Sequence, residues 1–96
     1  MNVGICKVRL RLPENSSLKG KRQVVKSIIA RTQNKFNVSI AEVDDNDLWQ
    51  LATIGVACVS NDSRFTNQEM SRIVDFIREC RFEAELLDFE TEILDV

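Results

Sequence analysis

At Gly4-Ile5-Cys6-Lys7-Val8-Arg9-Leu10-Arg11-Leu12 the chain alternates between two kinds of residue, and this stretch decides the fold. Small and apolar residues occupy the even positions, whereas the cations occupy odd positions together with Ile5. A period of two over this length is typical of a β-strand with one buried and one open face. Pro13 follows and ends the strand, because proline has no N–H to donate to a sheet.

The next segment has helical spacing. Apolar residues recur every three or four positions over residues 18–36, and Asn15-Ser16-Ser17 before them offers turn and N-cap chemistry. Residues 38–43 and 52–60 are then rich in β-branched side chains and predict two strands joined as a long hairpin.

The C-terminal third predicts a second helix and a last strand. Thr66-Asn67-Gln68-Glu69 matches a capping box, and residues 70–80 follow it with one apolar helical stripe. Residues 85–96 alternate again, with a change of phase at Leu86-Leu87 that predicts a β-bulge or the true start of the strand.

The resulting order, βαββαβ, predicts a single ferredoxin-like α/β domain over residues 1–96. Two right-handed crossovers place both helices on one face of a four-stranded antiparallel sheet. The last strand then pairs with the first, so that cations of one face acids of the other across the open sheet surface. The expected partners are Lys7, Arg9 and Arg11 on the first strand and Asp88, Glu90 and Glu92 on the last.

The net charge of −2 hides a strong division along the chain. Residues 1–48 hold nine Lys and Arg against five Asp and Glu, whereas residues 49–96 hold four against ten. Such a division indicates either a basic binding face or two neighbouring elements that neutralise each other. The expected pairing of the first and last strands accounts for much of it, but leaves the cations of the first helix unexplained.

The first helix opens with Ser17-Leu18-Lys19-Gly20-Lys21-Arg22. Each cation in a first turn costs roughly 0.3–1 kcal/mol against the helix dipole, and the free N–H groups there are ready donors to an anion. We therefore predict an anion- or RNA-binding site made of Lys19, Lys21, Arg22 and Lys26. The competing interpretation is a solvated cationic face. The central strands offer no aromatic side chain to the open face, so RNA contacts would be electrostatic rather than base-reading.

The sequence offers few residues for metal binding or catalysis. The chain has no histidine, and its cysteines (Cys6, Cys58 and Cys80) form no CxxC pair, which argues against a zinc site or a disulfide framework. We expect no cofactor and no metal; the acidic run at residues 44–47 lacks the spacing of a calcium loop and predicts polar loop and cap roles. Trp49 is expected to pack its connection against the domain, and an exposed binding aromatic is the alternative. We expect that the chain is not an enzyme. The alternative is catalysis with Cys6 or Cys58 as the nucleophile, although both side chains fall on the helix-facing side of their strands, where a thiol is usually inert.

Several short motifs resemble the bacterial YlxP-like family, a domain of unknown function. They are residues 9–14 (RLRLPE), 17–22 (SLKGKR), 36–39 (FNVS), 41–45 (AEVDD), 48–50 (LWQ) and 57–62 (ACVSND). The resemblance covers nearly the whole chain and implies a ferredoxin-like fold. It also implies a role near RNA or the ribosome, because genes of the family commonly lie among translation and ribosome-maturation genes. It supplies no catalytic residue.

Together these observations predict a cytoplasmic, non-enzymatic accessory protein of translation or ribosome assembly, with RNA or ribosomal particles as partner. No segment is apolar over the roughly 20 residues that a membrane span needs. Val3 and Ile5 beside the small residues Thr53, Gly55 and Ala57 predict a flat dimer contact, hence a homodimer. The alternatives are an ACT-like module that binds an anionic metabolite at a dimer contact, and a module that binds proteins through its open sheet.

Overall fold

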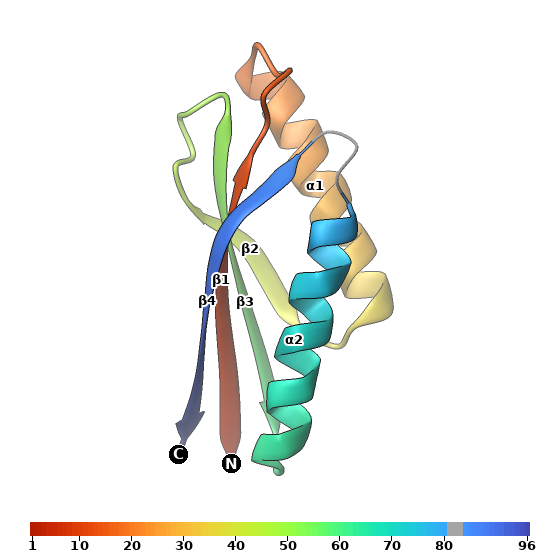
Figure 1. The fold of residues 1–96 in the computed structure, drawn as a ribbon, viewed down its shortest axis with the longest axis vertical. Helices are drawn as coiled ribbons and strands as arrows, with labels where there is room; N and C mark the ends of the chain where they lie inside the picture. The colour runs from red at the N-terminus through yellow and green to blue at the C-terminus, as the bar shows by residue number, and fades with distance from the viewer. Residues whose placement is uncertain (81–83) are drawn as a thin grey trace.

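β1 (Asn2–Arg11) runs through the middle of the sheet, antiparallel to β3 (Leu51–Ser60) on one side and to β4 (Glu85–Asp95) on the other. β2 (Ser39–Asp44) completes the order β2-β3-β1-β4. The helices α1 (Leu18–Lys35) and α2 (Ser63–Glu79) both lie on one face of this sheet (Figure 1). This computed structural model describes residues 1–80 and 84–96, and it confirms the predicted ferredoxin-like arrangement. Arg81, Phe82 and Glu83 lie outside the described residues.

The alternation in β1 separates core from surface as predicted. The even-numbered residues from Gly4 to Leu10 are buried beneath the helices, and the odd-numbered ones from Ile5 to Arg11 are exposed on the open face. Both helices and β3 complete the core. Its fully or nearly fully buried members include Val25, Ile28, Ile54, Val56, Ile73 and Ile77.

Gly4 lies directly beneath α2. A Cβ atom there would lie 2.5 Å from Thr66 Cγ2 and 3.3 Å from Met70 Cγ, so β1 has no room for a larger residue at this position. The glycine is therefore needed for packing, since α2 crosses directly above it.

The structure confirms the N-cap predicted for α1 but not the one predicted for α2. The Ser17 hydroxyl accepts from the Gly20 N–H at 3.0 Å and caps α1, as expected. The capping box predicted for α2 is wrong, because Asp62 caps that helix earlier by accepting from the Arg64 N–H at 2.9 Å. Thr66 lies one turn inside α2, where its buried hydroxyl bonds to the Asp62 carbonyl.

The bulge expected at Leu86-Leu87 is present. Arg9 lies opposite Asp88, whereas the next residue, Leu10, lies opposite Leu86, so Leu87 has no partner in β1. This extra residue shifts the register of every pair beyond it.

The shift corrects part of the expected charge pairing. Arg9 pairs with Asp88 at 3.0 Å, and Lys7 lies opposite Glu90 in the register, as predicted. Arg11, however, pairs with Glu85 at 3.8 Å, and Glu92 lies opposite an apolar residue instead of a cation. The open face of β1 and β4 is nevertheless a surface on which opposite charges lie side by side.

Candidate functional site

Lys21 is fully buried at the start of α1, and this removes it from the predicted anion site. Its ammonium donates hydrogen bonds to the backbone carbonyls of Asp45, Asn46 and Leu51 at 2.7, 3.1 and 3.1 Å. An ammonium has three N–H groups, so none is left for an external anion. The prediction for Lys21 is corrected: this cation holds the connection between β2 and β3 against the helix.

Glu42 supplies the charge that Lys21 needs inside the protein. Its Oε2 atom lies 2.9 Å from Lys21 Nζ and makes no hydrogen bond of its own. A buried cation is tolerated only when it is paired and hydrogen-bonded, and Lys21 meets both conditions. The first turn of α1 thus contains one cation, Lys21, that stabilises the fold. This role cannot be recognised from the pattern of charges in the sequence.

The other predicted site residues lie on the outside of α1. Lys19, Arg22 and Lys26 are all exposed, and their spacing of three and four residues places them on one stripe of the helix. The stripe extends about 10 Å along the axis at 1.5 Å per residue. The structure therefore brings these three cations together and leaves their binding role as a prediction.

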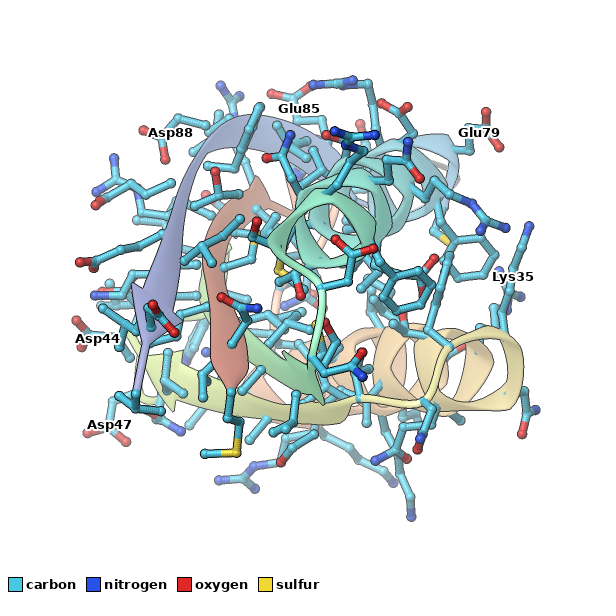
Figure 2. All side chains as sticks on the ribbon, turned by 90° about the horizontal axis from the view of Figure 1, so that it is seen from below. Lys35, Asp44, Asp47, Glu79, Glu85 and Asp88 are labelled. Carbon is cyan, nitrogen blue, oxygen red and sulfur yellow. The ribbon has the colours of Figure 1, made fainter. Side chains whose placement is uncertain are left out.

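The α1 stripe, as we call Lys19, Arg22 and Lys26, is not paired with any acid in the part of the chain that the structure describes. α1 contains no Asp or Glu, and within the described residues none of the three cations forms an ion pair. α1 packs against β2 and α2, whereas the acid-rich β4 packs against β1 and α2. In Figure 2 the labelled acids Glu85 and Asp88 lie on the β4 side, away from the ribbon of α1. The acids of β4 thus lie apart from the cations of α1, although they lie beside those of β1.

The connection between β2 and β3 is shaped by Asp45. This residue has a positive φ of 60°, and its carboxylate accepts from the Thr53 hydroxyl at 2.7 Å. Aspartate tolerates this left-handed conformation better than most residues. Asp44 also accepts the Asp45 N–H at 2.9 Å, so these two acids have turn roles. Over the described part of the chain no three acidic or thiol side chains gather in a metal-binding cluster.

Trp49 contradicts the prediction that it packs against the body of the domain. The residue is 54% exposed, and its neighbour Leu48 is exposed as well. Side-chain donors hold the backbone of this connection: besides Lys21, Asn15 Nδ2 donates to the Trp49 carbonyl at 2.5 Å and to the Ser17 carbonyl at 2.7 Å. The less favoured alternative, an exposed indole, is what the structure shows, because an isolated tryptophan in a polar loop gives no sequence signal of whether it faces water or the core.

Both strand cysteines are buried on the helix-facing side, as predicted. Burial raises the pKa of the Cys6 thiol from 9.0 to about 11. Burial also raises the pKa of Cys58, assisted by the charge of Glu69 and opposed by a hydrogen bond from the Gly4 backbone. Since the thiolate is the nucleophile, neither side chain has the environment of a reactive cysteine.

Both termini lie at one end of the sheet (Figure 1). The open sheet face carries exposed apolar side chains at this end. Val3 lies opposite Val59 on one side and Leu94 on the other, and Ile5 lies opposite Ala57. Ile5 is 39% exposed and Val59 65% exposed. We call these five residues the terminal apolar patch; it adjoins the charged rows of β1 and β4.

Two hollows in the described surface are small. One of about 200 Å³ is lined by Arg9, Asp45, Leu51 and Leu87, and one of about 160 Å³ lies at the Phe36 end of α1. Typical small-molecule pockets measure roughly 300–1,000 Å³.

Comparison with known proteins gives a family and a fold. A family model described as "Protein of unknown function (DUF503)" matches residues 3–91. The uncharacterized protein YlxP of Bacillus subtilis (strain 168) is 41% identical over 75 residues, which cover 78% of this chain and 82% of YlxP.

Two solved structures share the architecture. The de novo designed protein Foldit4 matches with a TM-score of 0.55 and 12% identity, over 100% of this chain and 99% of the design. A REP-associated tyrosine transposase bound to a REP hairpin matches with a TM-score of 0.51 and 13% identity, over 99% of this chain but only 57% of the transposase. At these identities the two matches show the shared fold alone. Neither helix of the described chain is long and apolar enough to cross a membrane.

Proposed function

We propose that this chain, which belongs to the DUF503 family of proteins of unknown function, is a non-enzymatic protein that binds RNA through the α1 stripe. The observation that carries the proposal is the set of three exposed cations on a helix without a single acid. Exposed cations that form no ion pair within the described chain are available to bind an external anion. A row of such cations matches the repeated negative charges of a phosphate backbone.

The cost of this arrangement supports the proposal. Lys19 and Arg22 stand near the helix start, where the dipole disfavours cations by roughly 0.3–1 kcal/mol each. The first turn of α1 has no acid to offset that cost. A helix start that carries cations against its own dipole is expected to have a use for them outside the fold.

The cellular role that we propose is that of an accessory factor in translation or ribosome assembly. The gene associations of the YlxP-like family are what point to this role. The thiols of Cys6 and Cys58 are buried and their pKa values are raised, which supports a binding function rather than an enzymatic one.

Sedimentation with ribosomal particles, at low and moderate salt, tests the proposal. We expect the protein to migrate with a subunit at low salt and to be released as salt rises. The variant Arg22→Glu/Lys26→Glu should lose co-migration. In solution with single-stranded RNA, the slope of log K against log salt should fall by about 1.4, which is about 0.7 for each of two lost contacts.

A matched control has the same change in charge at another place. Lys7→Glu/Arg64→Glu reverses two exposed cations, one on the open sheet face and one at the start of α2. This variant should bind RNA nearly as well as the natural chain. Equal losses in the two variants would show that only net charge matters and would refute a site on α1.

A second candidate concerns the terminal apolar patch. We propose that a second copy of the chain covers it, giving a homodimer. Contiguous exposed apolar area on a sheet face is characteristic of interaction sites. A two-fold axis would set the patch against itself, and would allow the cations of β1 in one copy to face the acids of β4 in the other.

The mass in solution tests the dimer. Light scattering should give twice the chain mass at high concentration, and Ile5→Glu should restore the monomer, because a carboxylate would be buried without a partner. Phe65→Glu is the control, since Phe65 is also exposed but lies in α2, away from the sheet. A monomeric natural chain would rule the dimer out.

A further inference from the structure

Trp49 is the single tryptophan of the chain, and its exposure needs a reason. A tryptophan buries the most apolar area of any side chain when it packs, so leaving it in water forfeits stability. Leu48 beside it is exposed too. Two large apolar side chains at the tip of one connection indicate a contact surface.

The backbone that presents Trp49 is held firmly in place. Lys21 donates to carbonyls on both sides of it, those of Asp45 and Asn46 before and Leu51 after. Gln50, the next residue, accepts the Leu12 N–H through its carbonyl at 2.8 Å. Trp49 is thus displayed by a pre-organised segment, and binding would not have to order the loop.

The same contacts place Trp49 at the start of α1. Asn15 bonds through one amide nitrogen to the carbonyls of Trp49 and Ser17, and Ser17 is the N-cap of the helix. The side chain of Asn15 also packs against Gly20, where an added Cβ would lie 2.2 Å from Asn15 Oδ1. The backbone of Trp49 therefore lies beside the first turn of α1, which bears Lys19 at the head of the α1 stripe.

We propose that Trp49 and the α1 stripe form one surface for single-stranded RNA, with a base stacked on the indole and phosphates along Lys19, Arg22 and Lys26. This inference rests on the proposed function and narrows its ligand. Exposed aromatic side chains beside cations are the means by which proteins bind single strands, because every unpaired base offers a face to stack. Bases inside a duplex are already stacked and cannot use the indole.

The single tryptophan makes the test direct. Addition of an unstructured oligouridylate should quench the indole fluorescence in a saturable way, and high salt should restore it. A blunt-ended RNA duplex of the same length should leave the fluorescence unchanged. Quenching by the duplex to the same extent would refute single-strand binding at Trp49.

Variants separate this inference from the function on which it rests. With fluorescently labelled oligouridylate, Trp49→Ala should bind about tenfold more weakly at an unchanged salt slope, and Trp49→Phe should retain most of the affinity. Both variants keep the carbonyl that Asn15 contacts, so the loop should stay in place. Thermal melting of each variant checks this.

The outcomes are distinct. If Trp49→Ala binds as tightly as the natural chain while Arg22→Glu/Lys26→Glu does not, RNA binding stands and the role of Trp49 is refuted. If Arg22→Glu/Lys26→Glu also binds normally, the proposed function fails. A shift of the indole emission to shorter wavelength with protein concentration alone would mean that another copy of the chain covers Trp49, and would overturn the inference.

Discussion

β1 and α1 are the two basic segments of the molecule, and they differ in whether their exposed cations form ion pairs. On β1, Arg9 and Arg11 form ion pairs with Asp88 and Glu85 of the neighbouring strand. On α1, the stripe has no acidic partner within the described chain. The comparison teaches that the number of cations in a segment does not identify a binding surface; what identifies it is whether the fold has already neutralised them.

Within α1 the same contrast operates between adjacent residues. Lys21 lies inside the protein with four oxygen atoms within 3.1 Å, whereas Arg22 lies in water. One turn of helix therefore contains a cation that serves the fold and a cation that is free for a partner. The predictions below test this division, first where the largest effect is expected.

Lys21→Met should cost about 3–5 kcal/mol in the free energy of unfolding, measured with urea. The substitution leaves three carbonyls without their donor and Glu42 without the charge it is paired with, and removal of one member of a buried ion pair has costs of this size. Arg22→Met is the control, and it should change stability by less than about 0.5 kcal/mol, as is usual at exposed positions.

The double variant Lys21→Met/Glu42→Met keeps the test informative if Lys21→Met fails to fold. It removes both charges, so part of the lost stability should return. A loss below about 1 kcal/mol in Lys21→Met would contradict the structural role of this cation and return it to the set of binding candidates.

Lys19→Glu should raise stability by about 0.3–1 kcal/mol at low ionic strength while it weakens RNA binding. An acid near a helix start interacts favourably with the dipole, whereas a cation does not. Thermal melting and binding on the same sample measure the two effects. If stability and binding fall together, Lys19 makes a contact within the fold, and the α1 stripe is shorter than we propose.

The smallest effect is expected for the ion pair of Arg9 and Asp88. A double-mutant cycle with alanine at each position should give a coupling of about 0.2–1 kcal/mol, because both side chains are 55% exposed. The coupling should shrink in 1 M salt, where screening is strong. No coupling at low salt would mean that β1 is no better neutralised than α1, and the contrast between the two segments would disappear.

Local pattern was sufficient for most of the fold. The alternation in β1, the cap at Ser17 and the phase change before Asp88 each depend on neighbouring residues, and each is present in the structure. The start of α2 was predicted wrongly because two residues, Asp62 and Thr66, compete as caps one turn apart. Sequence patterns place such an end only to within a few residues.

The sequence by itself determined the order of the elements, the buried side of β1 and the stripe of Lys19, Arg22 and Lys26, since period and spacing are local properties. Only the tertiary structure decided that Lys21 is internal and that Trp49 faces water. Both follow from how the connection between β2 and β3 lies against α1, through hydrogen bonds between residues 24 to 34 positions apart. Contacts between residues so far apart cannot be predicted from a helical or strand period, because they depend on where the folded sheet positions the loop.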